Sequence, residues 1–387
     1  MNTNQLLLNF IYTALFDRPS ERTLSESEAA AVFSSAKKNA VSSLVFRGIQ
    51  KSGADMDKDI FARYSEERDK DLYVYLMQAQ QITAISNLLE KHQIPFIVLK
   101  GGRMRDYYPS PELRTSTDID ILARAEDETL CRLMQNAGFT YEKDGGTTLN
   151  FSFASIVEIE IHRHLFDEKL PFHSYFDSIW ERAHRKEGWA YQLEMSAEDF
   201  FVNMIAHFAK HFSRYGCGIR NAIDLVVYLK NAPQSFSLSR AEEILKQIGL
   251  YDFEQRLLQL LHAWESDDWS QENKELTDYI LGCGLFGSTK TSTAHTITNS
   301  SDKRARQKSL LIHFFPNFRT MSNLYPVLKK CPVLLPFCWI ARCFRLLFSD
   351  RKKIKKTLQL HSQIDEKAIS EVNDILHKMH LEEFGAR

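Results

Sequence analysis

The spacing of hydrophobic and polar positions divides most of the chain into three stretches. Residues 1 to about 80 repeat apolar positions every three to four residues, which is typical of amphipathic helices. Between residues 81 and 165, short apolar or alternating runs are interspersed with helical spacing, and residues 166 to about 280 return to the helical pattern. Strands are predicted at residues 94–99, 119–122, 139–142, 149–153 and 156–165. The pattern predicts an α+β fold, in which a small mixed sheet is flanked by N- and C-terminal helical regions.

Residues 281–387 are predicted to form a linker and a C-terminal helical tail. Residues 288–303 are rich in Ser and Thr and predict the linker. The apolar run that follows is broken by four prolines, so no segment is long enough to cross a bilayer. Residues 336–356 combine large apolar side chains with seven basic ones, Arg342, Arg345, Arg351, Lys352, Lys353, Lys355 and Lys356. This combination is typical of a helix at a membrane surface, although the apolar face would also suit packing on the helical domain.

The strongest chemical signal lies in residues 98–122. A predicted strand runs into Gly101 and Gly102, and the next strand carries Asp118 and Asp120. Because successive strand residues point to opposite faces, the two aspartates share one face and the isoleucine between them takes the other. Two carboxylates beside a glycine turn that opens a helix suggest a site for divalent cations and for the phosphates of a nucleotide.

Charge provides the physical reason for this interpretation. Adjacent carboxylates repel each other, so Asp118 and Asp120 gain little from sharing a face unless cations lie between them. Mg²⁺ or Mn²⁺ could bridge carboxylates and phosphate oxygens. Gly101 and Gly102 would let the backbone approach those phosphates closely. The alternative is a solvated strand end, which the combination of strand, glycine turn, helix and second strand supports less well.

The segment around the aspartates resembles a known family. The matching residues are Leu99-Lys100-Gly101, Tyr107-Tyr108-Pro109, Leu113-Arg114, Asp118-Ile119-Asp120-Ile121-Leu122 and Ala137-Gly138-Phe139. They are similar to the bacterial uncharacterised nucleotidyltransferase family, within the superfamily of DNA polymerase beta. Fifteen residues separate Gly102 from Asp118, slightly more than the usual spacing of the superfamily, and the excess falls in the loop at 109–117. The resemblance implies a mixed-sheet nucleotidyltransferase core at residues 81–165.

The resemblance also implies a third acid on a later strand. Residues 156–165 alternate cleanly, with Glu158, Glu160 and His162 on one face. Family members carry an acid, an apolar residue and a His at this place, so Glu160 is the predicted third acid and Glu158 the second choice. His162 is a candidate contact to phosphate or acceptor. The alternative is that both glutamates belong to an exposed strand face.

Lys100 and Arg114 are predicted to bind phosphate together with Gly101 and Gly102. Arg114 lies in a loop four residues before Asp118, where it could clamp phosphate or anchor the loop by donating to backbone carbonyls. Lys100 has two similar interpretations, a cation aimed at phosphate or a buried stem at a strand end. The resemblance places an Arg at this position, which makes the phosphate-clamping interpretation of Arg114 as well supported as the anchoring one.

A histidine-containing helix follows in the predicted helical domain. His207 and His211 are four residues apart, so they lie on one side of that helix. A metal site is one interpretation, but hydrogen-bonded histidines at a domain interface are preferred, because no third ligand is nearby in the sequence. The resemblance places an Arg and an Asp on the next helix, at Arg220 and Asp224. His207, His211 and Arg220 are candidate contacts to phosphate or acceptor. Arg220 and Asp224 could also form an ordinary surface ion pair.

Composition narrows the class of partner and the compartment. The 387-residue chain has 44% hydrophobic and 26% charged residues, as expected for a globular protein with substantial cores. Its net charge of -1 provides no general attraction to nucleic acid, so a nucleic-acid substrate is not indicated. The six cysteines form no CxxC pair, and the N-terminus has no basic leader. We therefore expect a cytoplasmic protein, peripheral to the membrane if the tail binds lipid.

Together these patterns predict a metal-dependent nucleotidyltransferase. It would move a nucleoside monophosphate from a nucleoside triphosphate to a hydroxyl of a small molecule or of a peptide or protein, with release of pyrophosphate. Asp118, Asp120 and Glu160 would bind Mg²⁺ or Mn²⁺. Two alternatives are a catalytically idle nucleotide-binding or scaffold module, and a membrane-surface accessory protein of a polysaccharide or natural-product pathway. The predicted divisions are an N-terminal helical region (1–80), the core (81–165), a helical domain (166–280) and the linker with its tail (281–387).

Overall fold

The computed structural model describes residues 2–17, 24–285, 315–316, 318–348 and 366–384. The chain falls into two compact units. The first unit comprises Met1–Ala209 and Cys217–Leu285, and the second comprises Lys210–Gly216 and Phe286–Arg387. The first unit contains the sheet and every candidate site residue except His211.

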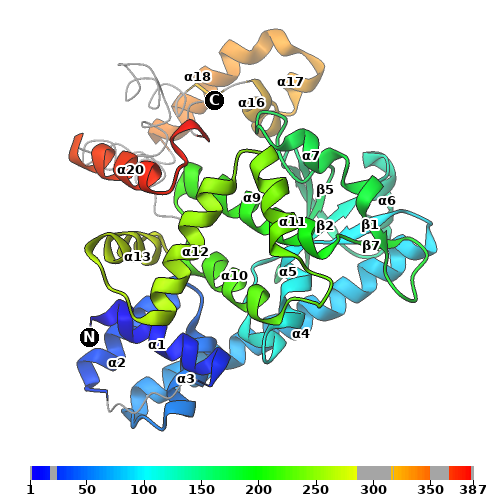
Figure 1. Cartoon of the computed structure of the whole chain (residues 1–387). Helices are drawn as coiled ribbons and strands as arrows, with labels where there is room; N and C mark the ends of the chain where they lie inside the picture. The colour runs from blue at the N-terminus through cyan, green and yellow to red at the C-terminus, as the bar shows by residue number, and fades with distance from the viewer. Residues whose placement is uncertain (1, 18–23, 286–314, 317, 349–365, 385–387) are drawn as a thin grey trace. The chain divides into compact units, whose positions relative to one another are not determined.

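A seven-stranded mixed sheet forms the core of the first unit (Figure 1). Its strands are β1 (Phe96–Val98), β2 (Asp118–Ala123), β3 (Thr140–Asp144), β4 (Thr148–Phe153), β5 (Val157–His162), β6 (His184–Arg185) and β7 (Gln192–Glu194). The spatial order is β3-β4-β5-β2-β1-β7-β6. β2 pairs in parallel with β5, and β1 with β7, whereas the other neighbouring strands are antiparallel. The prediction of an α+β fold with a mixed sheet is confirmed.

One face of the sheet is apolar and is covered by two helices. Ile119 and Ile121 of β2 are buried in one cluster with side chains of α4 (Lys58–Lys91) and α6 (Asp127–Asn136). The helices contribute Ile85, Leu89, Leu130 and Met134 to this cluster. In Figure 1, α4 runs along the sheet. Because strand residues alternate between faces, the polar residues of β2 point to the other face, where the candidate site lies.

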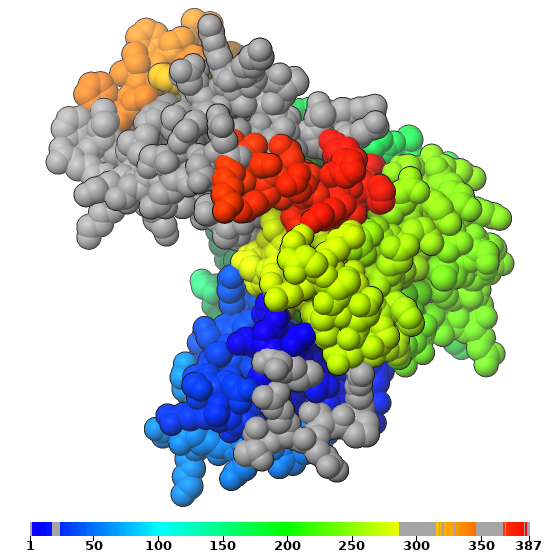
Figure 2. Space-filling model, turned by 60° about the vertical axis from the view of Figure 1, so that its left-hand side comes forward, coloured from blue at the N-terminus to red at the C-terminus, as the bar shows by residue number. Residues whose placement is uncertain are grey.

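Three N-terminal helices lie next to α13 (Gln271–Cys283), the last helix of the first unit. They are α1 (Thr3–Phe16), α2 (Glu26–Lys38) and α3 (Ser42–Ser52). Asn4 of α1 donates to Asp278 of α13 at 2.7 Å, and Figure 2 shows the N-terminal helices in blue beside α13 in yellow. α4 is a single helix of 34 residues, so it runs through the division expected near residue 80 and joins the N-terminal helices to the sheet.

The remaining helices of the first unit are the short helix of the glycine turn and those that follow β5. They are α5 (Lys100–Arg103), α7 (His173–Asp177), α8 (Ile179–Arg182), α9 (Ala197–Tyr215), α10 (Ile219–Asn231), α11 (Leu238–Gln247) and α12 (Tyr251–Ser266), with 3₁₀ turns η1 (Met104–Tyr107) and η2 (Pro111–Leu113). The hairpin of β6 and β7 interrupts the stretch expected to be helical. Strands of two and three residues are too short to show an alternating pattern, yet β7 extends the sheet by pairing Gln192 with Phe96.

The described part of the second unit is helical. It contains the end of α9 together with α16 (Phe318–Leu324), α17 (Val327–Lys330), η3 (Pro332–Leu334), α18 (Leu335–Phe348), α20 (Glu366–Lys378) and η4 (Glu382–Phe384). Met321, Leu328 and Cys338 form a small buried cluster. Among the described helices, none is both long and apolar enough to span a membrane. The predicted linker at 288–303 and the basic residues from 351 to 356 lie outside the described residues.

Candidate active site

The two aspartates of β2 lie beside the glutamates of β5. The strands pair in parallel, with Asp118 opposite Glu158 and Asp120 opposite Glu160. Their intervening isoleucines are buried in the apolar cluster on the other face. All four acids therefore belong to one face of the sheet, as the alternation of each strand requires.

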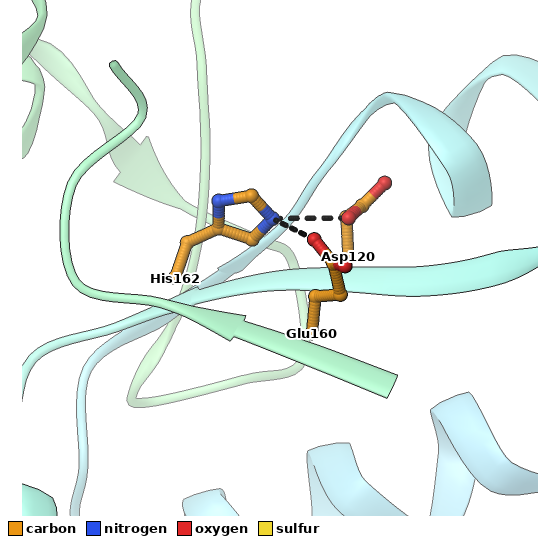
Figure 3. Close-up of side chains that lie close together, drawn as sticks. All are labelled: Asp120, Glu160 and His162. Atoms are coloured by element: carbon orange, nitrogen blue, oxygen red, sulfur yellow. Dashed lines mark hydrogen bonds and ion pairs between the residues drawn. The ribbon is translucent and has the colours of Figure 1, made fainter. Parts of the chain in front are cut away.

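Asp120, Glu160 and His162 form a close cluster, in which the three side chains point toward one another (Figure 3). One potential ligand atom from each residue lies within 4.8 Å of the other two. His162 Nε2 is 3.0 Å from Asp120 Oδ1 and 3.7 Å from Glu160 Oε2. Asn150 Nδ2 donates to Glu160 Oε1 at 3.1 Å, which orients that carboxylate. All three side chains are only partly buried, so the cluster is open to a ligand.

Glu158 stands apart from this cluster. Its side chain is exposed, whereas Glu160 is half-buried two residues further along β5. The structure thus brings Glu160, and not the second choice Glu158, together with Asp120. His162, a candidate phosphate or acceptor contact from the sequence, lies within hydrogen-bond distance of Asp120 as well.

The surroundings of Asp118 disfavour the ionised form of its carboxyl group. Burial, and then the negative charges of Asp120 and Glu160, raise the pKa of Asp118 from 3.8 to about 6, while the guanidinium of Arg220 acts in the opposite direction. Carboxylates that repel one another in this way are stabilised by a cation.

Replacing Asp118 with Asn is expected to stabilise the metal-free protein above pH 6. The Asp118 carboxyl ionises near pH 4 in the unfolded chain but near pH 6 in the folded protein, so the wild type loses roughly 2 to 3 kcal/mol of stability as the pH rises between these values. Below about pH 4 both states carry the neutral acid, and this advantage of the variant disappears. Urea unfolding of both proteins in EDTA checks the prediction, and an advantage that does not grow from pH 4 to 6 would contradict it.

A Cβ atom added at Gly101 would point to the opposite side of the turn from one added at Gly102. A Cβ atom at Gly101 would lie 3.6 Å from Asp120 Oδ2, so this glycine borders the acids. A Cβ atom at Gly102 would lie 2.7 Å from Val98 Cγ1 and 3.3 Å from Ile82 Cδ1, on the apolar side of the turn. The sequence assigned the same role to both glycines, but only Gly101 is next to the acidic side chains.

Lys100 and Arg114 converge on a buried aspartate, Asp224 of α10. Arg114 donates to the two Asp224 oxygens at 3.2 Å from Nε and 3.0 Å from Nη2, and Lys100 Nζ lies 3.0 Å from Oδ2. Tyr108 also donates to Asp224, at 2.9 Å. Arg114 further donates to the Gly101 carbonyl at 3.2 Å. For both basic residues, the geometry favours the anchoring interpretation over direct aim at phosphate.

The sequence pattern understated the role of Asp224. This side chain is fully buried, and although burial opposes its ionisation, Arg114 and Lys100 hold the pKa of Asp224 well below its usual range. A surface ion pair with Arg220 does not form, because Asp224 is buried and Arg220 donates to a loop carbonyl at 3.1 Å. One signal was available: Asp224 is the lone acid in the apolar run at 222–229, and an acid buried there requires a partner.

The remaining candidates lie on α9 and α10. Arg220 is close enough to Asp118 to lower the pKa of that carboxyl, and its hydrogen bond to the Thr115 carbonyl anchors the loop before β2. His207 and His211 lie half-buried on α9 and are not part of the acidic cluster of Asp120. Their contact with phosphate or acceptor stays a prediction.

Comparison with protein families identifies one family that covers these residues. Residues 25–265 match the family described as uncharacterised nucleotidyltransferase, and this interval contains the glycine turn, the acids of β2 and β5, and Asp224. Comparisons with curated proteins and with solved structures find no significant match. The family supports nucleotidyl transfer as the general activity and a nucleoside triphosphate as substrate. Since the match covers more than half of the chain, the protein belongs to the uncharacterised nucleotidyltransferase family.

Proposed function

We propose that this protein is a metal-dependent nucleotidyltransferase, which transfers a nucleoside monophosphate to a hydroxyl of a small molecule or of a peptide or protein. The observation that carries the proposal is the cluster of Asp120, Glu160 and His162 beside Asp118 and Gly101. It combines donors for a divalent metal with a glycine that leaves room for phosphate. Pyrophosphate is the expected second product.

The donor set fits Mg²⁺ or Mn²⁺. Carboxylate oxygens of Asp118, Asp120 and Glu160 are the ligands that Mg²⁺ prefers, and an imidazole nitrogen of His162 also suits a transition metal such as Mn²⁺. The raised pKa of Asp118 supports this fit, since it reflects negative charge that a cation would balance. Such a metal, when bound, would neutralise charge on the triphosphate and on the departing pyrophosphate.

The basic side chains near the glycine turn would act by position and by their summed charge. They are Lys100, Arg114 and Arg220, and the acids closest to them are Asp224 and Asp118. Lys100 and Arg114 are paired with Asp224, and Arg220 acts on Asp118, so these cations would offset part of the negative charge that the acids and a triphosphate bring together. The hydrogen bond from Arg114 to a turn carbonyl would keep the turn in place while phosphate binds.

A cavity of about 280 Å³ near these acids would accommodate the acceptor. Leu122, which lines the cavity, follows Asp120 by two residues on the same strand face, about 7 Å further along β2. Gly101 lies at the other end of the acids, near the start of β2. In-line transfer requires the acceptor and the leaving pyrophosphate on opposite sides of the α-phosphorus. An acceptor in this cavity, in contact with Trp180 and Arg124, would meet that requirement.

The proposed chemistry is a direct displacement. The acceptor oxygen forms a bond to the α-phosphorus as the bond from that phosphorus to the pyrophosphate oxygen breaks. Glu160 would take the hydroxyl proton, because its carboxylate is half-buried and is oriented by Asn150. His162 lies opposite Leu122 in the strand pairing, on the cavity side of Glu160, and would hold the acceptor or relay its proton.

Gly101→Ala is expected to preserve the fold and to weaken binding of the triphosphate. The added methyl group makes only ordinary contacts, the closest at 3.4 Å from Ser116 Oγ, but it occupies the space beside Asp120 where phosphate would approach. Gly102→Ala is the matched control, because its methyl group would lie 2.7 Å from Val98 Cγ1 and should cost about 1 to 3 kcal/mol of stability. Melting curves and calorimetry with nucleotide and Mg²⁺ test both variants. Wild-type nucleotide affinity in Gly101→Ala would contradict the proposed phosphate position.

Pyrophosphate release tests the proposed activity. The purified protein should release pyrophosphate when it is given Mg²⁺ or Mn²⁺, each of the four ribonucleoside triphosphates and a pool of acceptors. An idle nucleotide-binding module would bind nucleotide without releasing pyrophosphate, and that result would overturn the proposal of catalysis.

The prediction of membrane contact concerns the second unit. On α18, Phe337, Ile340 and Phe344 are 66%, 54% and 59% exposed, and their spacing of three and four residues places them on one helix face. An exposed apolar face suits contact with lipid, but most of the basic cluster that would bind headgroups lies outside the described residues. A role as a membrane-surface accessory protein therefore stays a prediction.

A further inference from the structure

A second cavity, of about 250 Å³, lies on the opposite side of the glycine turn from the acids. One face of α4 forms its longest wall, through Tyr75, Ala79, Ile82, Thr83 and Ser86. The first and last of these positions are eleven residues apart, so the wall spans about 16 Å. Gly102 and Val98 also line the cavity, in agreement with the direction in which Gly102 faces.

One end of this cavity contains a buried cation that forms no ion pair within the described residues. Arg105 is 4% exposed, and its guanidinium carbon lies 5.3 Å from the centre of the Tyr75 ring. It donates to the side chain of Gln78 and, at 3.4 Å, to the Arg114 carbonyl. In the described part of the chain, no carboxylate oxygen lies within 4.0 Å of it. Buried guanidinium groups are normally paired with an anion, so this end of the cavity suits a negatively charged group.

The other end contains two polar side chains whose polar atoms reach the cavity and have no hydrogen-bond partner in the described part of the protein. Ser86 and Gln192 line the cavity and are 3% and 4% exposed. Within the described ranges, neither side chain has a hydrogen-bond partner. The hairpin that carries Gln192 is tied to Glu90, one helical turn beyond Ser86, so the two polar groups belong to the same end. Their polar atoms are accessible from the cavity, so a ligand with matching donors and acceptors can bind them there.

The side chains at this end indicate the shape of the matching group. The carboxamide of Gln192 is planar and offers both donors and an acceptor, which matches an amide or the edge of a nucleobase. Trp189 lines the cavity as well and offers an aromatic surface for stacking.

The overall charge of the lining favours an anion. Its basic residues are Arg103, Arg105 and Lys186, and its acids are Asp106 and Glu194, which leaves one positive charge in excess. Lys186 and Glu194 pair with each other at 3.5 Å, so the excess resides with the two arginines.

We propose that this cavity binds a small organic anion with a planar, hydrogen-bonding head, which is the chemistry of a nucleoside monophosphate. The anionic group would pair with Arg105, and the head would occupy the end formed by Ser86, Gln192 and Trp189. This site is separate from the acids of β2 and β5 and does not rest on the proposed transfer activity.

Calorimetry in EDTA with each of the four ribonucleoside monophosphates tests the proposal. At least one monophosphate should bind the wild type, and its nucleoside and inorganic phosphate should bind more weakly, because each uses only one end of the cavity. Gln192→Leu removes a hydrogen-bonding group, and Ala79→Trp fills the cavity, so each should weaken binding about tenfold or more. Two independent variants keep the test valid if one of them fails to fold, which melting curves reveal.

Three results would overturn the inference. The first is the absence of binding by all four monophosphates, or wild-type affinity in both cavity variants. The second is equal binding of inorganic phosphate, which would show an anion site without a head group. The third is loss of binding in the Asp118→Ala, Asp120→Ala double variant, which should retain wild-type affinity if the ligand lies behind the glycine turn.

Discussion

Alanine at both Asp118 and Asp120 is expected to abolish metal-dependent binding of nucleoside triphosphate and to lower nucleotidyl transfer at least about a thousandfold. The double variant removes both carboxylates of the β2 face and leaves Glu160 and His162 as the remaining members of the cluster that Asp120 completes. Metal ions contribute several kcal/mol to reactions of this class, and about 4 kcal/mol corresponds to a factor of 10³ in rate. Calorimetry with and without Mg²⁺ measures binding, and pyrophosphate release measures transfer.

Glu158→Ala is the matched control for this experiment. Glu158 is opposite Asp118 in the strand pairing, but its side chain is exposed and is not part of the cluster with Asp120 and His162. This variant should bind nucleotide and transfer it at close to the wild-type rate. Unchanged metal-dependent binding in the double variant, or an equal loss in Glu158→Ala, would contradict the assignment of the metal ligands.

Asp224→Ala is expected to lower the free energy of unfolding by about 3 to 5 kcal/mol, because it breaks a buried ion pair on one side only. Lys100 and Arg114 are 7% and 4% exposed, and the substitution would leave both cations without their shared carboxylate. Tyr108 would lose its acceptor as well. Urea unfolding at neutral pH, where the wild-type carboxylate is ionised, measures the effect.

The matched control for Asp224 is an ion pair at the surface. Lys230 and Glu265 form such a pair, with side chains 37% and 47% exposed. Exposed pairs contribute little to stability, so Glu265→Ala should unfold at nearly the same urea concentration as the wild type. If Asp224→Ala were as stable as Glu265→Ala, Asp224 would not be the structural centre of this cluster.

The part of the site that lies within single strands could be predicted from the sequence. Alternation is a property of the strand itself, so the shared face of Asp118 and Asp120 follows from their spacing alone. The same holds for Glu158, Glu160 and His162 on β5. The choice of Glu160 depended on the family resemblance, and the parallel register of the two strands places it opposite Asp120.

Contacts between distant segments could not be predicted in the same way. Asp224 is 110 residues from Arg114, and a lone acid on an amphipathic helix gives no indication of which cation it will meet. The two glycines of the turn illustrate a second limit. Their pattern is identical in the sequence, but the phase of a four-residue helix decides that Gly101 faces the acids and Gly102 faces Val98.

Following isotopic label in the α- and γ-phosphates of a nucleoside triphosphate is the most direct test of nucleotidyl transfer by this protein. With Mg²⁺ and a pool of acceptors, the wild type is predicted to transfer label from an α-labelled nucleoside triphosphate to an acceptor and to release γ-label as pyrophosphate. The Asp118→Ala, Asp120→Ala variant should do neither. Transfer of γ-label to an acceptor would show phosphoryl transfer instead, and no transfer of α-label by the wild type with any of the four ribonucleotides would leave an idle nucleotide-binding module. Either result would contradict the assignment of this protein as an active nucleotidyltransferase.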